Sequence, residues 1–169
     1  QHPIASETVV VRVFRSTVDA ENNRQRLIDV DVELTEIEEE VALGGRPGGA
    51  YGGFSLRAMP AENQAMTPVV ESPIDVEGRS ARAWCDYAAD FPGSANRTSF
   101  ILLQNKENPG FPTEHLLYPN LNCFMPAFPG DREHSLVKDE PLVLKHRILL
   151  REGTASTESL ENAWDAYNN

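Results

Sequence analysis

The amino-acid sequence predicts an all-β fold, an antiparallel β-sandwich of the supersandwich kind with one short C-terminal helix. Three observations support this class. Segments in which apolar and polar residues alternate recur at short intervals along the chain. Apolar residues at helical spacing occur only in the tail. Twelve prolines and eleven glycines suit strands that are joined by tight turns.

The first two strands are predicted to form a hairpin. Residues 9–14 are a β-branched run, which favours a strand. Residues 25–35 alternate strictly, so one face of that strand is apolar and the other carries acids and Thr35. Asn22 and Asn23 between the two segments are typical turn residues. Four acids follow within residues 36–40, and we interpret them as a solvated strand end rather than a calcium site.

The rest of the chain continues this pattern. Strands are predicted at residues 51–58, 81–87, 98–104 and 141–151, and a short apolar segment at 121–128. Residues 44–49 and 59–73 are interpreted as loops. In the tail, Leu160, Ala163, Trp164 and Tyr167 recur at helical spacing, and Ser156 or Thr157 can cap that helix.

Length and charge limit the function. The 169 residues suit one domain over 1–169, and a chain that begins at Gln1 rather than Met is expected to be a processed or truncated piece. The net charge of −11 disfavours a nucleic-acid partner. No apolar run is long enough to span a bilayer, so no membrane partner is expected. We favour a periplasmic or secreted location.

The two cysteines, Cys85 and Cys123, are interpreted as buried free thiols, with a disulfide as the alternative. There is no CxxC or HxH pair, so no metal site is indicated. The sequence does not identify a cofactor.

Polar side chains within apolar strands are the candidate ligand-binding residues. Arg57 follows a paired-glycine segment and offers a fixed donor for hydroxyl or carboxylate oxygens. Trp84 and Asp86 share one side of a strand, where an aromatic plane and an acid suit the apolar face and the hydroxyls of a sugar. His146 lies within the apolar face of the last strand.

Residues 104–115 follow an apolar strand and are rich in groups that both donate and accept hydrogen bonds. Asn105 and Asn108 are predicted to bind substrate there. Glu114 or His115 is predicted to be the catalytic acid or base if it lies in a cleft.

Each candidate also has a structural alternative. Arg57 can form an ion pair, Trp84 can belong to the core, and His146 can be a hydrogen-bonded core residue. The amides of residues 104–115 can serve the turns of a stiff surface loop.

Four segments together resemble a bacterial family usually labelled "methane oxygenase PmoA-like". They are the Gly52-Gly53 segment that leads to Arg57, the Trp84-Cys85-Asp86-Tyr87 segment, Asn108-Pro109 through Pro112-Thr113, and the basic strand from Lys145 to Gly153. The resemblance covers about residues 25–155. It implies a supersandwich related in shape to galactose mutarotase, and a chain that is the C-terminal part of a longer one.

Two departures from that family pattern bear on chemistry. A D-H-P motif is replaced by Gln104-Asn105-Lys106, and a Trp-His pair is replaced by Glu114-His115. Only His115 is therefore carried over as an acid or base. An oxygenase activity is not expected, because the chain has neither a membrane-spanning segment nor a copper-ligand cluster.

The sequence thus predicts a carbohydrate-active domain that performs acid/base chemistry on a saccharide bound to a concave sheet face. The alternative is a non-catalytic carbohydrate-binding or scaffold module. A third interpretation is a structural half-sandwich that packs against a second copy, as a homo-oligomer, or against a missing N-terminal half.

Overall fold

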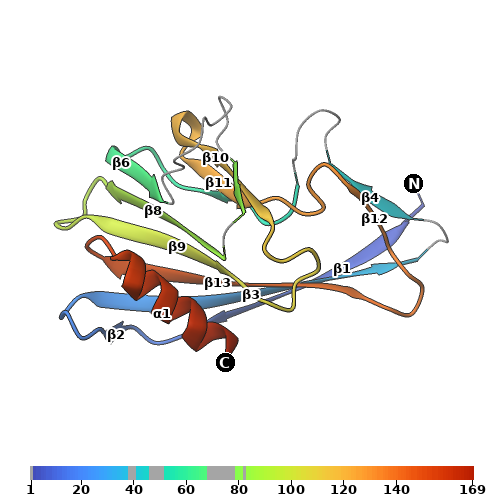
Figure 1. Ribbon diagram of the computed structural model, residues 1–169, viewed down its shortest axis with the longest axis horizontal. Helices are drawn as coiled ribbons and strands as arrows, with labels where there is room; N and C mark the ends of the chain where they lie inside the picture. The colour runs from blue at the N-terminus through green and yellow to red at the C-terminus, as the bar shows by residue number, and fades with distance from the viewer. Residues whose placement is uncertain (1, 38–40, 46–51, 68–78, 82) are drawn as a thin grey trace.

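The protein is a two-sheet β-sandwich with one helix, which confirms the predicted fold class (Figure 1). The computed structural model describes residues 2–37, 41–45, 52–67, 79–81 and 83–169. Among them, no helix is long and apolar enough to cross a membrane.

The larger sheet is antiparallel throughout and has the strand order β1-β3-β13-β9-β8-β6. Its strands are β1 (Ala5–Val13), β3 (Arg24–Glu36), β13 (Leu142–Glu152), β9 (Thr98–Gln104), β8 (Trp84–Asp90) and β6 (Glu62–Thr67), and the short β2 (Thr17–Val18) pairs with β3. The predicted pairing of the first strand with residues 25–35 is confirmed, with Val9 opposite Val32.

The smaller sheet has the order β5-β11-β10-β7. Its strands are β5 (Leu56–Arg57), β11 (Cys123–Pro126), β10 (Glu114–Tyr118) and β7 (Arg79–Ala81). A 3-10 turn, η1 (Pro119–Leu121), joins β10 to β11. A separate pair, β4 (Ala42–Gly44) with β12 (Glu133–Ser135), lies at the end of the molecule near the N-terminus (Figure 1).

The main core lies between the two sheets. Tyr87, Leu102 and Ile148 of the larger sheet pack in one cluster with Leu117 and Phe124 of the smaller sheet. Successive side chains of a strand point to opposite faces, so the neighbours of these residues lie on the other side of each sheet. Cys85 and Cys123 are both free and buried, as predicted.

Helix α1 (Thr157–Asn168) covers the other face of the larger sheet (Figure 1). Leu160 is buried against Trp84, Leu103 and Leu149. The predicted cap is confirmed, because the Ser156 side chain accepts a hydrogen bond from the backbone N–H of Ser159 at 3.2 Å. The tail helix thus closes a second core, as its apolar spacing predicted.

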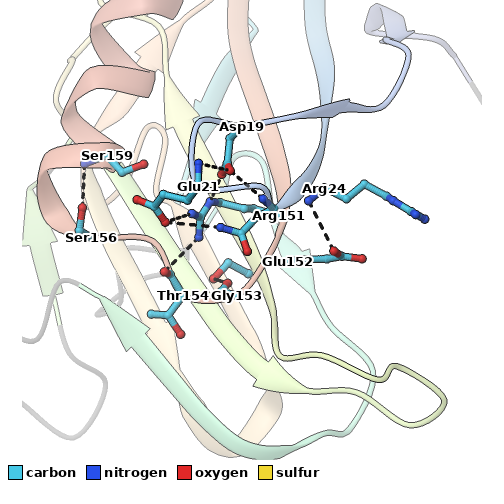
Figure 2. A network of polar contacts seen from close by, with 11 residues as sticks. Asp19, Glu21, Arg24, Arg151, Glu152, Gly153, Thr154, Ser156 and Ser159 are labelled. Carbon is cyan, nitrogen blue, oxygen red and sulfur yellow. Dashed lines mark hydrogen bonds and ion pairs between the residues drawn. The ribbon is translucent and has the colours of Figure 1, made fainter.

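A buried arginine fastens the start of this helix to the N-terminal hairpin (Figure 2). The Arg151 side chain is only 3% exposed. Its guanidinium donates to Asp19 at 2.7 Å, to Glu21 at 2.5 Å and to the backbone carbonyl of Thr154 at 3.0 Å. Two carboxylates and a carbonyl therefore satisfy the buried charge.

No strand was predicted at β2, β4, β6, β10 or β12. Residues 62–67 were interpreted as part of a loop but form β6, a sheet-edge strand whose register shifts between Glu62 and Ala65. An exposed edge strand with an irregular register has no clean alternation to detect. Residues 68–73 of that predicted loop lie outside the described part, as do 46–49 of the glycine-rich loop. Strand β10 was hidden within a polar segment that was interpreted as a loop up to His115.

Strand β1 carries a row of apolar side chains that the described residues do not cover. Val9, Val11 and Val13 share the face of β3 that bears the main core, yet all three are exposed. The described part of the smaller sheet does not extend over them. Association with a second copy or with a preceding half of a longer chain stays a prediction.

Candidate functional site

The predicted ligand-binding residues do not share one concave sheet face, and that expectation is wrong. Arg57 is exposed and is paired in register with Cys123. The neighbouring Leu56 joins the main core, so strand alternation puts Arg57 on the outer face of the smaller sheet. Trp84 and Asp86 lie on the far side of the larger sheet, beneath α1.

Trp84 cannot serve as a sugar platform, because it belongs to the core. Its side chain is 5% exposed and packs with Leu103, Leu149 and Leu160. The structural alternative for this residue is therefore correct. An apolar aromatic ring and a helical tail are each visible in the sequence, but their contact is a tertiary feature.

Asp86 is equally inaccessible, with 2% of its surface exposed. Burial raises the pKa of its carboxyl to about 6, against the lowering effects of a hydrogen bond with Ser99 and of the charges of Arg97 and Arg151. Its Oδ1 atom has no hydrogen-bond partner among the described residues. Asp86 is thus a buried carboxyl with a raised pKa, and it does not line either of the two hollows described below.

The two predicted amides fix the loop that follows β9. Asn108 is buried, and its side chain donates to the Lys145 carbonyl at 2.8 Å and accepts from the Lys145 N–H at 2.7 Å. The Asn105 side chain accepts from the backbone N–H of Glu107 at 2.9 Å, which forms a turn. Asn108 thus extends the hydrogen bonding of β13, which is a structural role, and its predicted role as a sugar ligand stays a prediction.

Gln104 holds the other end of this loop. Its side-chain oxygen accepts from the Thr113 hydroxyl at 2.7 Å, and its amide donates to the Thr113 carbonyl at 3.3 Å. Trp164 of α1 donates its ring N–H to the Gln104 backbone carbonyl at 2.8 Å. Phe111 stacks on Trp164 with ring centroids 5.6 Å apart. The loop between β9 and β10 is therefore packed and hydrogen-bonded against α1.

Glu114 and His115, the two predicted catalytic residues, lie on opposite faces of β10. His115 is 0% exposed, and it shares the inward face of β10 with Leu117. Glu114, one position earlier, is exposed. Because neighbouring strand residues point to opposite faces, only one of the pair can meet a ligand. The prediction of His115 as an acid or base that contacts substrate is wrong in this structure.

Glu114 lines an open hollow of about 390 Å³, which we call the Glu114 hollow. Its walls are the loop before β10 and the segment that joins β11 to β12. Charged and polar side chains alternate there with Phe128 and prolines; they are Thr113, Glu114, Asp131, Arg132, Glu133 and His134. The rings of Phe128 and His134 pack edge to face, 5.1 Å between centroids.

A second cavity of about 490 Å³, the His146 pocket, lies on the other side of Phe128 and Pro129. His146 is on its floor and Glu7 contributes a carboxylate. The imidazole is 3% exposed and stacks on Phe54 at 4.9 Å. Burial lowers the pKa of His146 to about 4, with Asp31 acting in the opposite direction, so the ring is neutral at pH 7.

The paired glycines shape the wall between these two spaces. Gly52 and Gly53 have φ of +135° and +83°, and a β-carbon on Gly53 would lie 2.7 Å from the Pro126 carbonyl oxygen. The sequence argument that paired glycines permit a close approach is correct, but the approaching group is the backbone at 126–128 rather than a ligand.

Several lining residues had not been predicted. His134 carries no informative sequence context, and Glu7 lies at the exposed start of the first strand. The signal that could have found the Glu114 hollow is the Pro129-Gly130 turn followed by three consecutive charged residues. No group of three or more metal-ligating side chains occurs in the described ranges.

No curated protein and no solved structure matches this chain. A family model does match, over residues 1–165, and that family is described as one of unknown function. The match spans nearly the whole sequence and includes every strand of both sheets. The chain therefore belongs to the family of unknown function DUF6807.

Proposed function

We propose that this chain is a carbohydrate-active domain that binds a saccharide in the Glu114 hollow, with Glu114 as the acid or base. The observation that carries the proposal is the lining of this hollow. An exposed carboxylate lies in a concave space with other charged side chains and the ring of Phe128. Carboxylates accept hydrogen bonds from sugar hydroxyls, an arginine donates to their oxygens, and an aromatic ring packs on the C–H face of a sugar.

The charge distribution favours a neutral saccharide. Three acids, Glu114, Asp131 and Glu133, line the hollow together with the single arginine Arg132. The whole chain carries a net charge of −11. A polyanionic sugar would meet repulsion from both sources, whereas a neutral one would meet none.

The second candidate function is a non-catalytic binding module. The burial of His115 favours it, because one of the two predicted catalytic groups is then withdrawn from any ligand. Binding through Glu114, Arg132 and Phe128 needs no acid or base.

A panel of neutral oligosaccharides tests both candidates. Binding is measured by calorimetry and turnover by NMR of the sugar, for the unaltered chain and for Glu114→Gln. We expect the variant to lose turnover by a factor of at least about 100 while its affinity stays within about threefold. Glu161→Gln, an exposed glutamate on α1, is the matched control and is expected to change neither.

Binding without turnover of any sugar would favour the module. If no sugar binds, or if resonances that line the Glu114 hollow do not shift on binding, the proposed function is refuted.

A further inference from the structure

Strand β1 lies at one edge of the larger sheet, and no described strand pairs with its outer side. It runs for nine residues without a proline, and its register with β3 is unbroken from Ala5 to Val13. At the opposite edge, β6 has six residues and a register shift between Glu62 and Ala65. Short or irregular edges resist pairing with another strand, whereas long, regular and apolar edges favour it. Of these two edges, β1 is therefore the one suited to accept a further strand.

The hydrogen bonds at the two ends of β1 identify which of its backbone groups face outward. The Phe14 N–H donates to the Leu27 carbonyl at 3.0 Å, and the Ile37 N–H donates to the Ile4 carbonyl at 2.9 Å. In an antiparallel pair such bonds recur at every second residue, so the even-numbered residues of β1 bond to β3. The N–H and C=O groups of the odd-numbered residues from Glu7 to Val13 therefore point away from β3.

The side chains of these odd-numbered residues form an apolar row with a charge at each end. Val9, Val11 and Val13 are 49%, 56% and 60% exposed. Glu7 precedes the row and Arg15 follows it, and both are exposed. Within the described part of the chain, no ion pair uses either charge. The edge thus offers outward backbone groups and three valines between an acid and a base.

This order of side chains is complementary to itself. Two copies of β1 that pair antiparallel about a two-fold axis at Val11 bring together residues equally far before and after that position. Val11 then faces Val11 of the other copy, Val9 faces Val13, and Glu7 faces Arg15. All of these positions are odd-numbered, which matches the outward direction of their backbone groups. β-branched pairs and opposite charges that face each other across two strands stabilise the pairing.

Other registers lose this match. An axis at Val9 would place the Glu7 carboxylate opposite Val11, and an axis at Val13 would place Arg15 opposite Val11. An axis between two residues would place an outward backbone group opposite one that already bonds to β3. The positions of the two charges therefore select a second copy of this chain in the register at Val11.

We propose that the β1 edge over residues 7–15 is the interface of a homodimer, in which the larger sheets of two copies join into one continuous sheet at Val11. A strand of unrelated sequence would match only the backbone groups of this edge, whereas a second copy also matches its valines and both charges. The proposal does not involve the Glu114 hollow, so it is independent of the saccharide proposal.

Analytical ultracentrifugation of the full 169-residue chain tests the proposal. Chain concentrations of about 1–300 μM cover the affinity expected of a small interface, and we expect a reversible monomer–dimer equilibrium. Val11→Glu places two carboxylates face to face at the axis and should raise the dissociation constant at least about tenfold. Val137→Glu, at a valine outside β1 that is 52% exposed, is the matched control and should leave the dissociation constant unchanged.

An exchange of charges tests the register. Glu7→Arg and Arg15→Glu each turn both ionic pairs of the dimer into like-charge pairs, so each variant alone should have a dissociation constant about fivefold higher. In an equimolar mixture of the two variants, each introduced charge faces an opposite charge on the other copy. The mixture should therefore dimerise with a dissociation constant within about twofold of that of the unaltered chain.

Amide hydrogen exchange provides a test that needs no substitution. The amides of Val9, Val11 and Val13 should exchange more slowly as the chain concentration rises, because the second copy accepts their hydrogen bonds. The amides of Val10 and Arg12 bond to β3 within the same chain, so their protection should not depend on concentration. This comparison also decides the proposal if a variant does not fold.

A chain that stays monomeric at the highest concentration refutes the proposal and leaves this edge to a different protein or to another segment of a longer chain. A dimer that Val11→Glu leaves intact uses another surface, which also refutes it. The proposed register is wrong if the mixed charge variants do not recover, or if the exchange of the outward amides is independent of concentration.

Discussion

The substitution Gly53→Ala should be among the most damaging single-methyl changes in this chain. Gly53 has a φ of +83°, and its added β-carbon would lie 2.7 Å from the Pro126 carbonyl oxygen and 2.9 Å from the Phe128 nitrogen. The left-handed backbone alone costs about 1 kcal/mol for a residue with a β-carbon. Both close contacts are with backbone atoms, which cannot rotate away, and overpacking of this kind adds about 2 kcal/mol.

Gly93 provides a matched control, because its φ of +82° is nearly identical but no atom lies within 4 Å of the position that a β-carbon would take. Gly93→Ala should therefore cost only the backbone strain of about 1 kcal/mol. Urea unfolding of both variants, with a shared m-value, measures the two losses. We expect Gly53→Ala to lose about 2 kcal/mol more than Gly93→Ala. Equal losses would show that the contact between the glycine segment and the 126–128 backbone does not hold in solution.

Two further predictions concern buried charges. The pKa of Asp86 is raised from 3.8 to about 6 in the folded protein, so the folded state binds more protons between those pH values and the unfolding free energy falls as pH rises through them. Asp86→Asn should remove this fall, so the free energy of unfolding of the variant at pH 7 should be up to about 3 kcal/mol higher than that of the unaltered chain. If the pH dependence of stability is the same in both proteins, the pKa of Asp86 is not raised. Arg151→Met leaves Asp19 and Glu21 without their buried partner and should cost about 2–3 kcal/mol in urea unfolding. The loss from Arg12→Met, at an exposed ion pair, should be smaller, and equal losses would refute the importance of burial.

Strand prediction succeeded where a strand has one buried and one wet face. In β3, apolar and acidic residues alternate because the inner face meets the core and the outer face does not, so the period of two is visible in the sequence. The same logic located β13, whereas β9, which is buried on both faces, was located as a short apolar run. It failed for β6, since an exposed edge strand packs few side chains and selects no pattern.

The site predictions failed for a different reason. Trp84 and His115 were chosen as polar or aromatic residues next to apolar strands, a property that a core residue shares with a ligand-binding residue. The packing of the whole sheet, and not the local sequence, determines which face of a strand is covered by a helix. Once α1 lies on the Trp84 face, that ring becomes part of the core.

The sequence by itself determined that this chain forms antiparallel strands and a capped tail helix, because alternation and capping depend on residues close in the chain. The tertiary structure alone decided which polar side chains meet solvent. The separation of Glu114 from His115, and the meeting of Glu7, Phe54 and His146 around one pocket, depend on strands far apart in the sequence. Their packing brings together residues whose local patterns carry no trace of one another.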